Sequence, residues 1–159
     1  MIRSAVLAAV VALAGSVLVG SATAQAEEVR TASLHGTYAC SVPPGYTYAR
    51  LRDNMACGGV PTSVEYLLLD YVRYDLTGTA ACEVPAGLTY TASRTNVACP
   101  LKGFYNLEFV LADPAKRNLT GTWACGLPSG YTYQAVRTNG ECYAPGTGAN
   151  PKEYLLLRY

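Results

Sequence analysis

Residue types that could recognise a ligand recur along this sequence at a constant spacing. A tyrosine ring offers a flat apolar surface to a sugar ring or a peptide, while arginine, asparagine and glutamate side chains direct hydrogen bonds. Each set has a tyrosine, an arginine four positions later and an asparagine two positions after that. The candidate ligand-binding residues are Tyr48, Arg52 and Asn54, then Tyr90, Arg94 and Asn96, then Tyr133, Arg137 and Asn139, and they are followed by Glu65, Glu108 and Glu153.

Two interpretations of these sets are open at the level of sequence. In the binding interpretation, three equivalent weak sites face one way and gain affinity together on a polysaccharide or a cell surface. In the structural interpretation, each arginine pairs with a glutamate on a neighbouring strand, each asparagine makes a turn, and each tyrosine packs over a disulfide.

Motifs of the common enzyme classes are absent from the sequence. It contains no H-E-x-x-H, G-x-S-x-G, P-loop or dinucleotide fingerprint. The single histidine, His35, stands where the other copies have threonine, and we expect it to be a surface residue of the first strand. A carboxylate pair that cleaves glycosidic bonds stays an open alternative, because that chemistry depends on distances in space. We nevertheless expect no catalysis and no cofactor, since residues repeated in every copy are typical of structure or of multivalent binding.

The six cysteines follow the same spacing as the candidate sets. They form three pairs separated by 17 positions, namely Cys40–Cys57, Cys82–Cys99 and Cys125–Cys142. Equal spacing in every copy favours one disulfide inside each repeat, with bridges between repeats as the alternative. A zinc site is not expected, because the short C-x2-C spacing and further histidines are missing. Each closed loop should stabilise the fold by about 3 kcal/mol, mainly by restricting the unfolded chain.

All these residues belong to a unit that occurs three times. Its pattern is L-x-G-T-x-A-C-x-x-P-x-G-x-T-Y-x-x-x-R-x-N-x-x-C, and it starts at Leu34, Leu76 and Leu119. An apolar run such as Tyr66-Leu67-Leu68-Leu69 closes each unit. The sequence therefore predicts repeat 1 at residues 34–75, repeat 2 at 76–118 and repeat 3 at 119–159. Units this short have too little core to fold unaided. The junctions at residues 70–75 and 113–118 are short and lack a linker rich in Pro, Gly or Ser, so we expect the repeats to pack as one compact body.

The local sequence predicts an all-β fold. A short strand at residues 36–40 ends at a Pro-x-Gly turn, and the apolar run forms the most buried strand. After the turn, Tyr46 and Tyr48 alternate at period 2 and should share a sheet face with Arg52. A helix over residues 48–53 is the alternative. We expect the sheet to continue across the repeats, which either close into a pseudo-threefold ring or stack linearly.

Residues 1–26 have the features of a cleaved secretory signal peptide, and residues 27–33 then form an N-terminal extension. Arg3 supplies the positive start, and an A-x-A site ends at Ala26. The apolar run 5–19 is shorter than the roughly 20 residues of a membrane helix, so no membrane segment is expected after cleavage. Its alanine-rich composition is typical of bacteria. We expect secretion to the exterior, or to the periplasm if the source has an outer membrane.

Charge excludes one class of partner and leaves three functional hypotheses. A net charge of +1 lacks the surplus of lysine and arginine that nucleic-acid binding requires. We expect a secreted, lectin-like binding protein that recognises carbohydrate or another extracellular surface. The alternatives are a protease inhibitor that presents the loop at residues 143–146, and a structural or surface-coat protein without a ligand. Trp123 is expected to fill the core, and the oligomeric state is open.

Overall fold

The computed structural model describes residues 32–58, 63–100, 106–143 and 151–159. The chain divides into two units, Met1–Thr31 and Ala32–Tyr159, and the described residues all belong to the second. The predicted signal peptide at residues 1–26 lies outside them, as does most of the extension at 27–33. Within the described ranges, no helix is long and apolar enough to cross a membrane.

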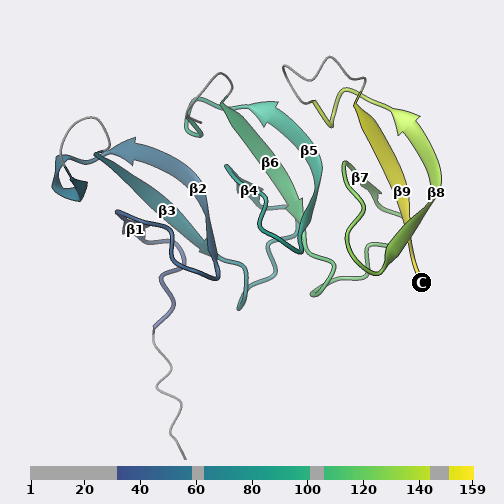
Figure 1. Ribbon diagram of the computed structural model, residues 1–159, viewed down its shortest axis with the longest axis horizontal. Coiled ribbons are helices and arrows are strands. Elements are labelled where there is room, and N and C mark those ends of the chain that lie inside the picture. Colours follow the sequence, from purple (N-terminus) through teal and green to yellow (C-terminus); the bar gives the residue numbers. More distant parts are fainter. Residues whose placement is uncertain (1–31, 59–62, 101–105, 144–150) are drawn as a thin grey trace, which may run out of the picture. The chain divides into compact units, whose positions relative to one another are not determined.

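Each repeat forms its own three-stranded antiparallel sheet, which confirms the all-β fold of three tandem disulfide-stapled repeats (Figure 1). The strand that comes last in the sequence of a repeat is central in its sheet, so the orders are β1-β3-β2, β4-β6-β5 and β7-β9-β8. The strands are β1 (Tyr38–Ala39), β2 (Tyr46–Asp53), β3 (Val64–Asp70), β4 (Ala80–Ala81), β5 (Thr89–Thr95), β6 (Leu107–Ala112), β7 (Trp123–Ala124), β8 (Tyr131–Thr138) and β9 (Lys152–Arg158).

The Pro-x-Gly turns lead into the long outer strands, as the sequence predicts. In repeat 1 the Tyr46 N–H donates to the carbonyl oxygen of Pro43 at 3.2 Å, and Gly45 adopts a φ of 85° at the third turn position. That conformation favours glycine, because side chains with a Cβ rarely adopt positive φ. The same turn bond recurs before β5 and β8.

A β-bulge interrupts each outer strand directly after the tyrosine of the candidate set. In β2, Tyr48 lies opposite Leu68 but Arg50 lies opposite Leu67, so one extra residue is accommodated. The extra residue reverses the alternation of side chains. Tyr48 and Arg52 therefore lie on opposite faces of the sheet, and the prediction that they share a face is wrong. The same shift follows Tyr90 in β5 and Tyr133 in β8.

The helical alternative over residues 48–53 is also wrong, since these residues belong to β2. The helical turn comes later, as the 3-10 helix η1 (Met55–Cys57). Asn54 caps it, because its side-chain oxygen accepts a hydrogen bond from the N–H of Ala56 at 3.0 Å.

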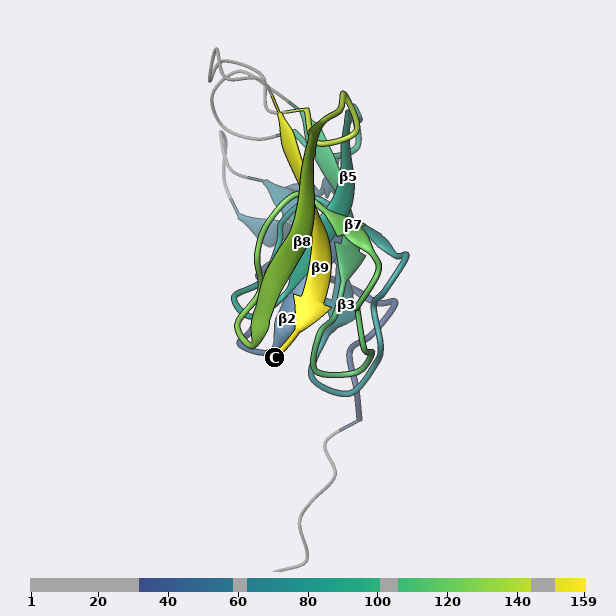
Figure 2. The same ribbon diagram turned by 90° about the vertical axis from the view of Figure 1, so that its right-hand side faces the viewer.

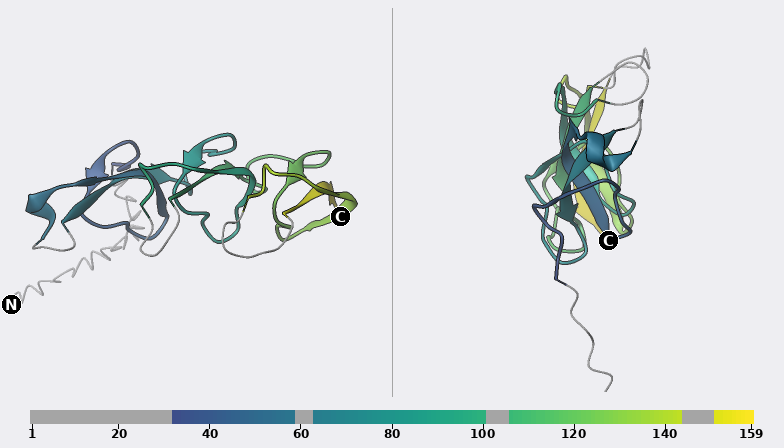
Figure 3. Two further views of the ribbon diagram at one scale, coloured as in Figure 1. Left: turned by 90° about the horizontal axis from the view of Figure 1, so that it is seen from above. Right: turned by 90° about the vertical axis from the view of Figure 1, so that its left-hand side faces the viewer.

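Backbone hydrogen bonds join neighbouring repeats without merging their sheets, so the prediction of one continuous sheet is wrong. At the first junction, the backbone N–H of Cys82 donates to the carbonyl oxygen of Tyr48 at 2.8 Å. The backbone N–H of Leu51 donates to the carbonyl oxygen of Ala98 at 2.9 Å. The second junction repeats both bonds at the equivalent positions. Across the described part of the chain the sheets follow one another in sequence order (Figure 1 and Figure 3) and overlap when viewed along that row (Figure 2). This is the linear stack rather than the ring.

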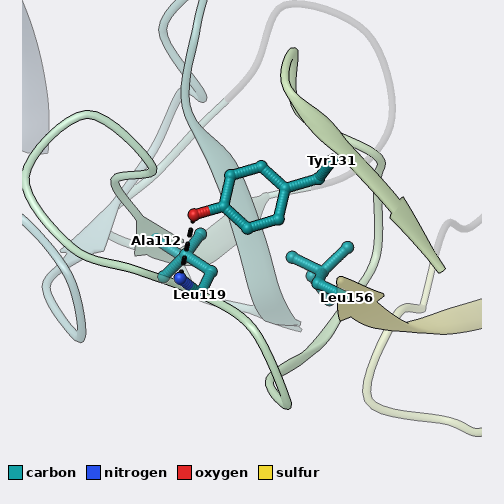
Figure 4. Close-up of a cluster of buried hydrophobic side chains, with 5 residues drawn as sticks. Ala112, Leu119, Tyr131 and Leu156 are labelled. Carbon is teal, nitrogen blue, oxygen red and sulfur yellow. Dashed lines mark hydrogen bonds between the residues drawn. The ribbon is translucent and has the colours of Figure 1, made fainter. Parts of the chain in front are cut away.

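The hydrophobic core lies where repeats meet. One cluster combines Leu69 of repeat 1 with Leu76, Ala81 and Leu111 of repeat 2. The second packs Ala112 of repeat 2 against the side chains of repeat 3 (Figure 4), namely Leu119, Ala124, Tyr131 and Leu156. Each repeat thus completes the core of its neighbour, which explains how units too small to fold alone become stable together.

All six cysteines form the predicted disulfides, one within each repeat. Their surroundings differ along the stack. Cys82 and Cys99 are 1% and 0% exposed, whereas Cys40 is exposed to solvent and Cys57 is partly buried.

Candidate functional site

Each candidate arginine lies directly opposite a glutamate of the central strand, as the structural interpretation expects. Arg52 forms an ion pair with Glu65. In repeat 2, Arg94 Nε donates to Glu108 Oε1 at 2.7 Å, and repeat 3 has the same pair between Arg137 and Glu153. The glutamate side chains are only 9%, 5% and 1% exposed, and the arginines 55%, 68% and 46%. A buried carboxylate thus holds a half-exposed guanidinium at the same position of each repeat.

The asparagine of repeats 1 and 2 completes this arrangement. Asn54 Nδ2 donates to Glu65 Oε2 at 2.7 Å, and Asn96 donates to Glu108 in the same way. The hydrogen bond from Asn54, followed by that from Arg52, holds the pKa of Glu65 below its usual value. Both oxygens of each carboxylate are therefore engaged by the side chains of the same repeat, so the glutamates act as structural anchors.

Repeat 3 departs from the pattern. The side-chain oxygen of Asn139 accepts a hydrogen bond from the N–H of Glu141 at 3.4 Å. Oε1 of the buried Glu153 has no hydrogen-bond partner among the described residues. The third site is thus an arginine–glutamate pair without the asparagine.

Aromatic rings support the guanidinium groups in two of the repeats. The Arg52 guanidinium lies 3.6 Å from the centre of the Tyr38 ring, and that of Arg137 lies 4.2 Å from the centre of the Trp123 ring. The equivalent residue in repeat 2 is Ala80, and Arg94 is the most exposed of the three arginines. Trp123 is partly buried beneath the arginine, rather than simply a core filler as expected. The sequence did not predict this role of Tyr38, although the repeat pattern puts Tyr38 at the position of Trp123.

The three tyrosines of the candidate sets lie apart from the arginines. Tyr48 is 8% exposed and packs with Cys82 and Cys99, the disulfide of the following repeat. Tyr90 is partly buried, and burial raises the pKa of both hydroxyls. Tyr133 is 48% exposed. The structure thus brings the arginines and asparagines together but does not bring the tyrosines to them.

His35 has a structural role in the turn before β1. Its Nδ1 accepts a hydrogen bond from the Asp70 N–H at 3.1 Å. Thr77 and Thr120 use their hydroxyl oxygens at the equivalent positions, where they accept from Asp113 and Arg158 at 3.0 and 3.1 Å. The histidine therefore replaces the acceptor that the other repeats obtain from threonine.

Three further candidates for a site are a groove, a metal cluster and the predicted inhibitor loop. A groove of about 280 Å³ is lined by the apolar side chains of Val72 and Leu88 and by Lys116, whose Nζ already donates to the carbonyl oxygen of Val72 at 2.8 Å. In the described ranges, no three His, Cys, Asp or Glu side chains gather in a way that could hold a metal ion. Of the predicted inhibitor loop, Tyr143 is exposed, and residues 144–146 lie outside the described residues.

Comparison with known proteins gives no relative. No family model, no curated protein and no solved structure matches the chain.

Proposed function

We propose that the protein is a secreted, non-catalytic binding protein whose repeats each present an arginine to an extracellular glycan. The predicted signal peptide and the three disulfides support export, because disulfides persist in oxidising compartments. The observation that carries the proposal is the half-exposed guanidinium held by a buried glutamate at the same position of every repeat.

The chemistry of this group favours glycans that carry carboxylate or sulfate. The glutamate engages part of the guanidinium and orients it, while the exposed part is available to a ligand. A guanidinium matches planar anions with paired hydrogen bonds, and stacking on Tyr38 or Trp123 restricts its motion before binding. Single sites of this kind are weak. Three on one chain gain by avidity on a polymer that presents its anionic groups repeatedly.

Binding to an array of acidic and neutral glycans tests the proposal. Replacing each arginine–glutamate pair by two glutamines, as in R94Q/E108Q, removes the guanidinium without stranding a buried charge. We expect wild-type protein to be retained on acidic glycans and the protein altered in all three repeats to lose at least about 100-fold in apparent affinity. Lys152→Gln is the matched control, because Lys152 also carries a positive charge but lies on the opposite face of the β8–β9 pair from Arg137. Binding that survives the triple replacement, or a wild-type protein that ignores every glycan, overturns the proposal.

A structural or surface-coat role is the second candidate. It is favoured by one observation, the exposure in repeat 3 of a surface that the other repeats bury, with Tyr133 48% exposed and its equivalent Tyr48 only 8%. A coat protein would use such a surface to contact further copies.

A further inference from the structure

The two junctions between repeats are formed by the same hydrogen bonds at equivalent positions. At the first junction, the Tyr48 carbonyl accepts from Cys82, and the Leu51 N–H donates to Ala98. At the second, the carbonyl oxygen of Tyr90 accepts from Cys125 at 2.8 Å, and Ser93 donates to Glu141 at 2.6 Å. These are equivalent positions of the repeat, so the outer strand of one repeat always meets the disulfide segment of the next.

A threonine hydroxyl adds a third recurring contact. Thr47 Oγ1 donates to the carbonyl oxygen of Glu83 at 3.0 Å, and Thr89 Oγ1 donates to that of Gly126 at 3.0 Å. Both threonines are buried, with exposures of 1% and 4%. Two backbone bonds and one hydroxyl bond therefore recur at both junctions.

The outer strand of repeat 3 presents the same surface uncovered. Its equivalent residues are Thr132, Tyr133 and Val136; the last two are 48% and 44% exposed, and Thr132 is exposed as well. Tyr133 and Val136 share a face of the sheet, because they lie opposite Leu156 and Tyr154 of β9. An outer strand with an apolar face and unused backbone groups is a template for further pairing.

The complementary surface is uncovered in repeat 1. The N–H of Cys40 corresponds to the donors of Cys82 and Cys125, and the carbonyl oxygens of Ser41 and Ala56 correspond to the acceptors at the two junctions. Cys40, Ser41 and Ala56 are all exposed, whereas Cys82 is 1% exposed. The molecule thus carries both halves of its own internal interface.

We propose that the protein associates head to tail, with β8 of one copy docked on the Cys40–Cys57 segment of repeat 1 of a second copy. In this contact the backbone N–H of Cys40 in the second copy donates to the carbonyl oxygen of Tyr133 in the first. The backbone N–H of Val136 and the Oγ1 of Thr132 in the first copy donate to the carbonyl oxygens of Ala56 and Ser41, respectively, in the second. The two surfaces differ, so the contact is heterologous and each added copy exposes a new β8, which produces open chains. The inference is independent of the glycan proposal, because Arg137 and Tyr133 lie on opposite faces of the sheet.

Sedimentation of the purified protein over a concentration series tests the association. We expect the average mass of wild-type protein to rise with concentration and Val136→Lys to weaken association at least tenfold, since the lysine would be buried at the contact. Val97→Lys is the matched control, because Val97 is 84% exposed in repeat 2. The Val97→Lys protein should therefore associate like wild type. Tyr133→Lys is a second blocking variant, and circular dichroism with disulfide mapping checks that each variant folds. Wild-type protein that stays monomeric up to about 1 mM, or blocked variants that associate normally, overturns the proposal.

A mixing experiment determines the direction of the contact. Labelled Val136→Lys protein keeps an intact repeat 1 surface, so we expect it to co-sediment with unlabelled wild type and to shorten the chains by ending them. A symmetric contact between two copies of β8 would exclude the labelled variant from wild-type oligomers. Failure to co-sediment therefore overturns the head-to-tail contact.

Discussion

The backbone N–H of Cys82 donates a 2.8 Å hydrogen bond to the carbonyl oxygen of Tyr48, and so joins the disulfide of the second repeat to the bulged strand of the first. The ring of Tyr48 packs on the same disulfide. The bulge directly after this tyrosine interrupts pairing with the central strand, while the tyrosine carbonyl bonds to the next repeat. Tyrosine, bulge and disulfide therefore act together as the connection between repeats.

The first prediction concerns this tyrosine. Tyr48→Ala should destabilise the protein by about 3–5 kcal/mol, because it removes a buried ring from the junction. Tyr133→Ala, the same change at a 48% exposed ring, should cost less than about 1 kcal/mol. Urea unfolding followed by tyrosine fluorescence measures both. Equal losses of stability in Tyr48→Ala and Tyr133→Ala would show that the ring of Tyr48 stabilises its own repeat rather than the junction.

The second prediction compares two disulfides with loops of equal length. Replacing either pair by alanine should cost about 3 kcal/mol through the unfolded chain. Cys82→Ala/Cys99→Ala should cost about 1–2 kcal/mol more than Cys40→Ala/Cys57→Ala, because Tyr48 packs on the former pair and Cys40 is exposed. Unfolding in urea at low protein concentration checks the difference. If the two double variants are equally stable, packing at the junction adds nothing to the disulfide.

The third prediction concerns the pH dependence that Glu65 confers. Its folded-state pKa is lowered, chiefly by Asn54, so its contribution to stability is complete above its unfolded-state pKa and is lost as the pH falls through the folded-state pKa. Asn54→Asp keeps the oxygen that caps η1 but removes the donor to Glu65. The pKa of Glu65 should rise, and the variant should lose most stability near neutral pH and least in acid.

An NMR titration of the Glu65 carboxyl measures this shift directly, and urea unfolding at neutral and acidic pH measures the loss of stability. Asn118→Asp is the control, because the Asn118 side chain likewise accepts from an N–H two positions later, at 3.1 Å, and Asp75 has the same role in repeat 1 at 2.8 Å. A Glu65 pKa that is unchanged in Asn54→Asp would contradict the proposed cause.

The fourth prediction concerns His35. His35→Thr should restore the acceptor used in repeats 2 and 3, while His35→Val leaves the N–H of Asp70 without its partner. Both variants lose the contact of the histidine ring with Tyr74, so the difference between them isolates the hydrogen bond. We expect the His35→Thr protein to be more stable than the His35→Val protein by about 1 kcal/mol in thermal or urea unfolding. Equal stabilities would mean that the acceptor is dispensable.

The sequence was a good guide to features that depend on neighbouring residues. The recurrence of the cysteines predicted their pairing, and the Pro-x-Gly signals predicted the turns before β2, β5 and β8, because turn geometry depends on a few adjacent φ and ψ angles. The pairing of Arg52 with Glu65 was also one of the alternatives drawn from the repeated pattern. Alternation failed at Tyr48, because a single bulged residue has no sequence signature yet moves every later side chain to the other face.

By itself, therefore, the sequence determined the three repeats, their stapling and their β character, which are local and periodic properties. Only the tertiary structure decided that Tyr48 packs on the disulfide of the next repeat and that the core lies at the junctions. It also decided that the sheets stay separate and that Arg52 faces away from Tyr48. The physical reason is that strand register and stacking are set by contacts between residues some 30 to 50 positions apart, such as Leu51 with Ala98, whose energies are not encoded in any one segment of the chain.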